Sequence, residues 1–437
     1  MKIKKVWLSV AVLSFACGGG GESPTGPTVN TGSCSTLGQV TFVRDRMLDI
    51  YLWYREVPNL SPASFSSPQA YLDAARYRQF DTSFSFLISR ADYNALFLES
   101  SSVAIGISYV RTGETELRLT EVQPGSPASD AGLERGDFLI AVNGKTVAEL
   151  LQTGEINTIF GPRQAGVAVD LAWRKPAGGE LRATLVKRTI SITTVRATRV
   201  LDAGGMRVGY VFYRDFVQPS VDLLNAAFTE MGAAGATELV LDLRYNPGGD
   251  TGVMQHLAGL LAGARAQGQV FVEMAYNDKN TSRNTIQRFA RPPAALSLSR
   301  LVVITTRTSA SASESIINGL RPYIPVVMVG DTTYGKPVGQ AGFEFCDSLF
   351  FPVSFAVRNA RGEGDYFGGI PADCAAGDDL DYQLGDAREA SLAEAIGYLR
   401  NGSCSGRATA AARVLAAREA LWPQPAVDPW QQMIGLY

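Results

Sequence analysis

The chain has 437 residues, of which 46% are hydrophobic and 19% are charged, and its formal net charge is −2. These values are typical of a folded protein with two or three domains and exclude a disordered chain. The sequence has no basic run, so nucleic-acid binding has no electrostatic support. His256 is the only histidine, which excludes a metal site built from several histidines.

Residues 1–17 have the pattern of an export signal. Three lysines among the first five residues precede an apolar run, residues 6–16, that is too short to span a bilayer. Cys17 and the glycines that follow it resemble a bacterial lipoprotein signal, so we expect Cys17 to be lipidated and to anchor the protein to a membrane. Ordinary cleavage and release is the alternative. Residues 18–36, rich in Gly, Pro, Ser and Thr, are predicted to form a flexible linker.

Export would permit disulfides among the four remaining cysteines. A Cys346–Cys374 pair would staple a local hairpin region, and a Cys34–Cys404 pair would tie the two ends of the folded part together. The sequence leaves other pairings open. A cysteine metal site is disfavoured, because no two cysteines have the short C-x-x-C spacing.

Residues 37–100 predict a small N-terminal helical domain. Aromatic and aliphatic residues recur at helical spacing, and Pro58, Pro62 and Pro68 divide the pattern into short helices. The aromatic stripe that includes Tyr51 and Trp53 is interpreted as core and not as a ligand platform.

Residues 101–190 predict a compact, β-rich unit with strands at 104–110, 117–122, 137–142, 167–173 and 181–186. The segments Gly125-Ser-Pro-Ala128 and Ile140-Ala-Val-Asn-Gly144 resemble those of a bacterial PDZ domain. The resemblance implies that backbone N–H groups at Ile105, Gly106 and Ile107 bind the carboxylate of a chain terminus, while the peptide adds as a β-strand.

Residues 191–405 alternate between strand and helix patterns, which indicates an α/β fold. Strands are predicted at 208–213, 238–244, 301–305, 324–329 and 349–357, and helices at 221–231, 253–262 and 387–399. Asn246-Pro-Gly-Gly249 follows the second of these strands and is by itself a generic turn, although glycines there allow close approach of the backbone to a ligand. Residues 406–437 are predicted to form a C-terminal tail.

Small residues, Ser309-Ala-Ser-Ala-Ser313, separate the strand at 301–305 from a helical pattern. Backbone N–H groups at a helix start are unpaired and carry partial positive charge. A serine at this point can therefore act as a nucleophile beside an oxyanion hole. The alternative is structural, because Ser311-x-x-Glu314 is also a good helix-capping box.

A serine nucleophile needs a base, and His256 is interpreted as a residue on a helix face. In serine hydrolases without a catalytic histidine, lysine is the usual general base. Lys336 follows the strand at 324–329, and its spacing from Ser311 leaves room for the helix and strand that would return the chain to the same sheet edge. An ordinary lysine has a pKa of about 10.4, so burial would have to lower the pKa of Lys336 toward about 7 for it to act as a base at neutral pH.

Three segments, with the PDZ-like unit before them, resemble the C-terminal processing peptidases, also called tail-specific proteases. The segments are Leu241-Asp-Leu-Arg-Tyr-Asn-Pro-Gly-Gly249, Ser309-Ala-Ser-Ala-Ser-Glu314, and Gly335-Lys336 with Gln340. The matching parts cover roughly residues 103–400. Asp242 and Arg244, within the first segment, are interpreted as an internal charge pair.

The resemblance implies a crotonase-like (ClpP-like) α/β peptidase core. It implies Ser311 as nucleophile, Lys336 as general base and Gln340 as the residue that orients the lysine. The N–H groups of Ala312 and of Gly248 or Gly249 would form the oxyanion hole. Pro337 departs from the family pattern, in which a small residue more often follows the lysine, and it removes one backbone N–H.

The sequence therefore predicts an exported serine endopeptidase of the cell envelope or periplasm, lipid-anchored and recruiting protein substrates by their C-termini. No cofactor, metal or nucleic acid is expected, and the oligomeric state is left open. One alternative is a non-proteolytic binding protein on the same fold, which would have no reason to keep both Ser311 and Lys336. A second is a hydrolase of small esters or amides, which has little use for a PDZ unit.

Overall fold

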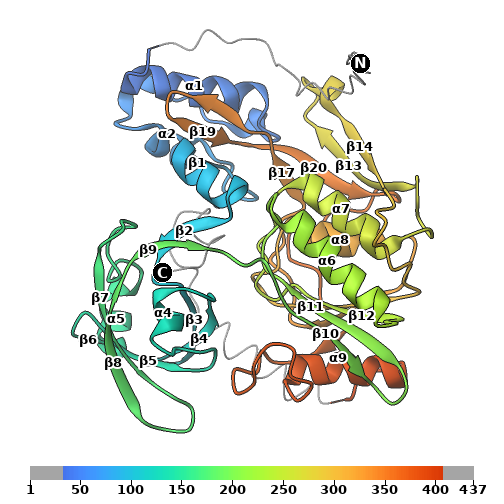
Figure 1. The fold of residues 1–437 in the computed structure, drawn as a ribbon. Helices are drawn as coiled ribbons and strands as arrows, with labels where there is room; N and C mark the ends of the chain where they lie inside the picture. Colours follow the sequence, from blue (N-terminus) through green and yellow to red (C-terminus); the bar gives the residue numbers. More distant parts are fainter. Residues whose placement is uncertain (1–32, 407–437) are drawn as a thin grey trace, which may run out of the picture.

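The computed structural model of the chain describes residues 33–406 (Figure 1). Within them, the central sheet has the strand order β10-β11-β12-β15-β16-β21, parallel from β11 to β21 and antiparallel at the β10 edge. Its strands are β10 (Val195–Asp202), β11 (Arg207–Tyr213), β12 (Glu238–Asp242), β15 (Leu301–Thr305), β16 (Val326–Gly330) and β21 (Cys374–Ala375). The α/β fold predicted for this region is confirmed.

Helices cover both faces of the central sheet. On one face lie α6 (Ser220–Ala233), α7 (Thr251–Ala262) and α8 (Ala312–Leu320), and on the other lies α9 (Ala390–Asn401) (Figure 1). Alternate residues of β15 enter different cores, since Val303 packs on the α8 side whereas Val302 and Ile304 pack on the α9 side. Strands buried on both faces are continuous apolar runs, which is why the sequence predicted them well.

A second, antiparallel sheet packs against α8 in the order β14-β13-β20-β17. Its strands are β13 (Val270–Tyr276), β14 (Thr285–Arg288), β17 (Val338–Gln340) and β20 (Val353–Asn359), with the 3-10 helix η5 (Thr281–Arg283) between β13 and β14. The prediction of a single strand over 349–357 is wrong. Pro352 divides that run between β19 (Ser348–Phe351) and β20, which belong to different sheets.

The N-terminal unit is mainly helical but contains strands that the sequence did not predict. Its helices are α1 (Thr36–Asp49), η1 (Tyr54–Glu56), η2 (Pro62–Ser64), α2 (Pro68–Ala75), α3 (Arg90–Tyr93) and the π-helix η3 (Asn94–Leu98). Strand β1 (Phe86–Ser89) pairs with β19, which pairs with β18 (Phe343–Phe345). Tyr51 is fully buried, as expected for core, whereas Trp53 keeps part of its surface exposed.

The β-rich unit forms a sheet in the order β3-β4-β5-β7-β8, with β6 paired to β5. Its elements are β3 (Ile107–Gly113), β4 (Glu116–Val122), α4 (Pro127–Asp130), β5 (Phe138–Val142), β6 (Lys145–Thr146), α5 (Val147–Thr153), η4 (Glu155–Asn157), β7 (Ala168–Arg174) and β8 (Glu180–Val186). Strands β2 (Ser101–Ala104) and β9 (Arg188–Ser191) pair antiparallel, so the chain enters and leaves the unit side by side.

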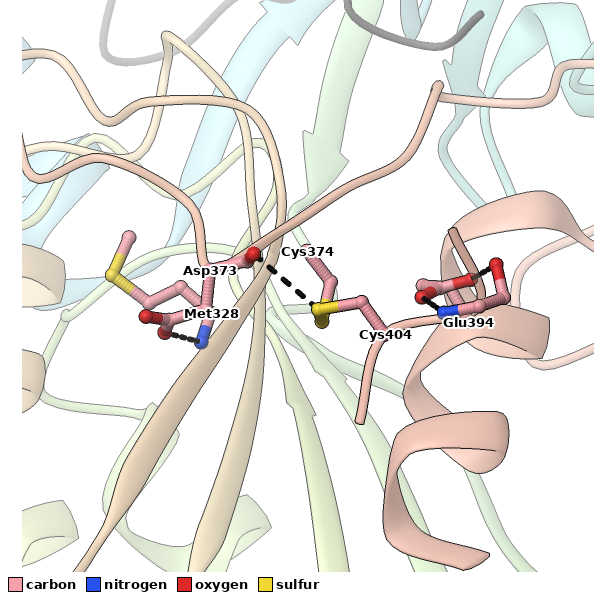
Figure 2. The surroundings of a disulfide bond; sticks show 6 residues. Met328, Asp373, Cys374, Glu394 and Cys404 are labelled. Carbon is pink, nitrogen blue, oxygen red and sulfur yellow. Dashed lines mark hydrogen bonds between the residues drawn. A yellow bond between two sulfur atoms is a disulfide. The ribbon is translucent and has the colours of Figure 1, made fainter. Parts of the chain in front are cut away.

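Two disulfides join Cys34 to Cys346 and Cys374 to Cys404. The two pairings that we considered from the sequence are therefore wrong, because the β18–β19 hairpin, which contains Cys346, belongs to the N-terminal unit. Figure 2 shows the second bond, which ties β21 to the segment after α9. Disulfides indicate an oxidising, extracytoplasmic location.

Within residues 33–406, no helix is both long and apolar enough to cross a membrane. The predicted export signal, the lipidation site Cys17 and residues 407–437 of the predicted tail lie outside the described residues.

Candidate active site

Ser311 lies at the turn from β15 into α8, where it is the N-cap residue with φ +56°. A positive φ is costly for a non-glycine residue and persists only when its surroundings enforce it. The neighbouring serines are engaged elsewhere, since Ser309 Oγ donates to Leu243 O at 2.8 Å and Ser313 Oγ donates to Asn246 O at 2.9 Å. Of the three serines, Ser311 is thus the one whose hydroxyl donates to no backbone carbonyl within residues 33–406, while its side chain takes part in the capping box of α8.

Glu314 connects Ser311 to Lys336. Its fully buried carboxylate accepts, through Oε2, the backbone N–H of Ser311 at 2.9 Å and that of Lys336 at 2.8 Å. Through Oε1 it accepts Gly335 N–H and the Thr333 hydroxyl. Burial raises the pKa of Glu314, while these four donors favour its charged form. The sequence indicated only a capping role for Glu314, and the link to Lys336 was missed.

The loop after β12 lies against Ser311. Gly248 has φ +102°, and a Cβ added there would lie 2.8 Å from Ser311 Cβ and 2.9 Å from Ala312 N. Gly249 has φ +139°, and a Cβ at that position would collide with Phe216 O. Only glycine fits such positions without strain. The turn therefore lies close to Ser311, as its glycines allow.

The backbone N–H groups near Ser311 differ in whether they already donate a hydrogen bond within the protein. Gly248 N–H already donates to Asn246 Oδ1 at 2.9 Å. Within residues 33–406, the N–H groups of Gly249 and Ala312 have no protein acceptor. Of the two glycines that the sequence offered as oxyanion donors, Gly249 is therefore the one with an available N–H.

Lys336 lies beneath the N-terminal unit, next to β17. Burial lowers the pKa of Lys336 to about 8, against the opposing charges of Asp81 and Glu314. Its Nζ lies 5.5 Å from the centre of the Phe84 ring. Asp81 is fully buried and accepts the N–H of Phe84 at 2.8 Å. One loop of the N-terminal unit therefore supplies both Asp81 and Phe84, the two groups that lie near the Lys336 amine. No sequence pattern pointed to this loop.

Gln340 does not bond to the lysine directly. Its Nε2 donates to Phe84 O at 2.8 Å, so it holds the residue whose ring faces Lys336. The predicted role of Gln340 in orienting the lysine stays a prediction, and the contact that the structure shows is with the residue beside Lys336.

His256 and the Asp242–Arg244 pair are structural, as the sequence indicated. His256 lies on α7 and its Nε2 bonds Asn225 Oδ1 at 2.9 Å. Arg244 is buried in ion pairs with Asp242, Asp378 and Glu389. It fixes the end of β12, from which the glycine loop begins.

The predicted carboxylate-binding segment, residues 105–107, leads into β3, which among residues 33–406 is the first strand in the order of its sheet. Gly106 has φ +91°, and a Cβ there would collide with the Ser126 side chain. The side chains of Ile105 and Ile107 are fully buried, which fixes the backbone between them. An edge strand that begins at such a turn has the form needed to accept an added strand.

Within the described part of the chain, Cys374, Glu394 and Cys404 form the single group of His, Cys, Asp or Glu side chains close enough to share a metal ion. The two cysteines form a disulfide, which removes the thiolates that metals bind.

Three segments of the chain match models of known protein families. Residues 207–374 match the family model described as Peptidase family S41, residues 38–86 match the Peptidase S41 N-terminal domain, and residues 118–158 match a PDZ domain. The chain belongs to peptidase family S41, a family of serine peptidases with a Ser-Lys dyad.

Its relatives are C-terminal processing proteases. The carboxyl-terminal-processing protease of Picosynechococcus is 26% identical over 286 residues, 63% of this chain and 65% of that protein. The carboxy-terminal processing protease CtpB of Bacillus subtilis is 28% identical over 248 residues, 56% of this chain and 48% of that protein. The chain thus covers between about half and two thirds of these relatives' length. A crystal structure from Bacteroides fragilis, assigned as an S41 protease, aligns with a TM-score of 0.68 and 28% identity over 83% of this chain and 97% of that one.

Proposed function

We propose that the protein is an exported serine endopeptidase that hydrolyses peptide bonds in protein substrates with a Ser311–Lys336 dyad. The observation that carries this proposal is the Glu314 carboxylate, which bonds the backbones of Ser311 and Lys336 with the same oxygen. The lowered lysine pKa supports it, because at pH 7 a group with a pKa of about 8 is neutral in about one molecule in ten.

The chemistry follows from these positions. Ser311 Oγ attacks the peptide carbonyl carbon, and the neutral Lys336 amine takes the Oγ proton. The N–H groups of Ala312 and Gly249 stabilise the oxyanion. The lysine ammonium then protonates the leaving amine as the C–N bond breaks. Water, deprotonated by Lys336, hydrolyses the acyl-enzyme and releases the acid product.

Gln340 acts through Phe84. Its hydrogen bond to the Phe84 carbonyl holds the Phe84 ring over Lys336. The ring in turn excludes water from the Lys336 amine. Exclusion of water is what keeps the lysine pKa low.

The PDZ unit recruits substrates by their C-termini. The position of β3 at the end of the strand order and the turn at Gly106 support this role, because an added strand and a terminal carboxylate would bind there together. Two disulfides support export, and the lipoprotein-type pattern at Cys17 supports anchoring to the membrane.

Cleavage of unfolded casein by the exported form tests the proposal. The parent should cleave, and both Ser311→Ala and Lys336→Ala should lose activity while circular dichroism stays unchanged. Loss in Ser311→Ala alone would remove Lys336 from the role of base. A parent that neither cleaves casein nor reacts with a serine-directed fluorophosphonate would favour a binding protein on this fold.

A further inference from the structure

A small pocket lies directly beside Ser311. Its volume is about 20 Å³, and Gly249 and Ala312 are among the residues that line it. The N–H groups of these two residues are the ones that we assign to the oxyanion hole. A peptide carbonyl held between them and Ser311 Oγ belongs to a residue whose Cβ is only two bonds from the carbonyl carbon. We call it the acyl residue, because it stays on Ser311 in the acyl-enzyme, and its side chain is the one that meets this pocket.

Large apolar side chains from three different elements line the pocket. They are Met254 of α7, Met274 of β13 and Phe355 of β20. Their exposed fractions are only 2%, 7% and 4%, and all three belong to one hydrophobic core. Met274 is paired with Val357 across β13 and β20, so the two side chains share the face of the second sheet that packs on α8. The pocket therefore ends against packed core.

The Phe355 ring is held in place by its neighbours. A Cβ added at Gly339 of β17 would lie 2.2 Å from a ring atom of Phe355, so the backbone of β17 lies directly against the ring. The Tyr276 ring lies 5.2 Å from the Phe355 ring, centre to centre. Because Phe355 is fixed in this way, the two methionines are the side chains that decide how deep the pocket is.

The size of the pocket limits the side chains that can enter it. About 10–15 Å³ is needed to admit one water-sized group, so a pocket of about 20 Å³ admits a methyl group and little more. A branched or aromatic side chain would have to displace closely packed core atoms, which is unfavourable. Among the described residues, no charged side chain lines the pocket, so a charged acyl residue would be buried there without a partner.

We propose that Met254, Met274 and Phe355 determine which peptide bonds are cleaved. They admit alanine, or an uncharged residue of similar size, as the acyl residue, and they exclude leucine, phenylalanine and charged residues. The inference rests on the proposed peptidase function and adds the class of bond on which it acts.

The cleavage sites in unfolded casein give the first test. Mass spectrometry of the fragments identifies the acyl residue at each site. A peptide that contains one of these sites is then made with Gly, Ala, Leu, Phe or Asp as the acyl residue. We expect kcat/KM for the Ala peptide to exceed the values for the Leu, Phe and Asp peptides by about tenfold or more.

Variants assign this preference to the methionines. Met254→Ala and Met274→Ala each enlarge the pocket, so the ratio of kcat/KM for the Ala peptide to that for the Leu peptide should fall by about tenfold or more. Met231→Ala is the matched control, because Met231 is a buried methionine of the same core that does not line the pocket. It should keep the parent's ratio. Met254→Val is a milder enlargement should Met254→Ala unfold.

The ratio separates the effect of the pocket from damage to the fold, because a damaged fold lowers cleavage of all peptides together. Equal kcat/KM values for the Ala, Leu and Phe peptides in the parent would overturn the inference and leave the peptidase function intact. A ratio that stays unchanged in both Met254→Ala and Met274→Ala would also overturn it. If the parent cuts neither casein nor any peptide, the proposed function fails and the inferred selection with it.

Discussion

At the scale of single residues, Glu314 reconciles two interpretations of one motif. Ser311-x-x-Glu314 predicted a helix cap, and Glu314 does accept the Ser311 N–H. The same carboxylate also accepts the Lys336 N–H, which no local pattern could indicate because the two residues meet only in the folded chain. A structural cap and an active-site support are here the same group.

Replacing this carboxylate should therefore damage catalysis more than binding. Glu314→Gln leaves one oxygen for four donors and, in either orientation of the amide, turns its NH2 group toward at least one backbone N–H, at a cost of about 1–3 kcal/mol in stability. Displacement of Ser311 and Lys336 should lower kcat by about 100-fold with little change in KM. Steady-state kinetics on one peptide measure both. A kcat within twofold of the parent would contradict the role assigned to Glu314.

The pKa of Lys336 gives the reaction a predictable pH dependence. The base must be neutral, so kcat/KM should rise with pH and level off above about 8. The Asp81 charge raises the pKa of Lys336, so Asp81→Asn should move the midpoint to lower pH. Asp73→Asn, which removes an acid from the same unit, is the control and should leave the midpoint in place. A midpoint that stays or moves upward in Asp81→Asn would refute this electrostatic account.

The candidate residues were predictable to unequal degrees. Ser311 and Lys336 lie in motifs whose residue types and spacing suggest their chemistry. Asp81 and Phe84 lie in an ordinary loop, and they gain meaning only when the N-terminal unit packs over β17. Gln340 was identified from the family pattern, but its partner in the structure is the Phe84 carbonyl and not the lysine.

At the scale of elements, the glycine loop after β12 must approach α8 closely for an oxyanion hole to form. Gly248→Ala would place a methyl group 2.8 Å from Ser311 Cβ at a φ of +102°. We expect kcat to fall by about 10²–10³-fold, as for removal of an oxyanion donor. Gly397→Ala, in α9 with open space around it, is the matched control and should leave kcat unchanged. Retention of full activity in Gly248→Ala would exclude this loop from the oxyanion site.

The elements of the central sheet were predictable because buried parallel strands are apolar throughout. The strands β1, β18 and β19 were not predicted as one sheet, since their pairing joins residues 86–89 to residues 343–351. The disulfide pairing was missed for the same reason, because Cys34 reaches Cys346 only through that arrangement. Contacts between segments far apart in the sequence leave no local pattern.

At the scale of the whole molecule, three units meet around the site. The N-terminal unit packs over β17, which follows Lys336 closely in the chain, and the PDZ unit is joined to the core through the contacts of Arg135. Figure 1 shows the N-terminal unit and the PDZ unit on the same side of the core. Arg135 of the PDZ unit donates to the Tyr245 hydroxyl and pairs with Asp378, which also pairs with Arg244. Tyr245 directly precedes the loop of Gly248, so the PDZ unit supports the segment that we assign to the oxyanion hole.

If the PDZ unit binds substrate C-termini, the end group of a substrate should matter. A peptide with a free carboxylate should be cleaved with a KM roughly tenfold or more below that of its C-terminal amide, because charge-assisted hydrogen bonds are lost with the amide. Gly106→Val, which would collide with Ser126, should abolish the difference. Gly178→Ala is the control, with a positive φ in the same unit but open space around it. Equal KM values for acid and amide in the parent would remove the C-terminus as the recognised feature.

The most direct test of the Ser311–Lys336 dyad is the rate at which a fluorophosphonate labels the protein, followed by peptide mass spectrometry between pH 6 and pH 10. We expect the label on Ser311, with a rate that rises through a midpoint of about pH 8 in the parent. In Lys336→Ala that rate should fall by roughly 10²–10⁴-fold, the usual contribution of a general base, and lose its midpoint. A label on another residue, or an unchanged pH-dependent rate in Lys336→Ala, would contradict the dyad.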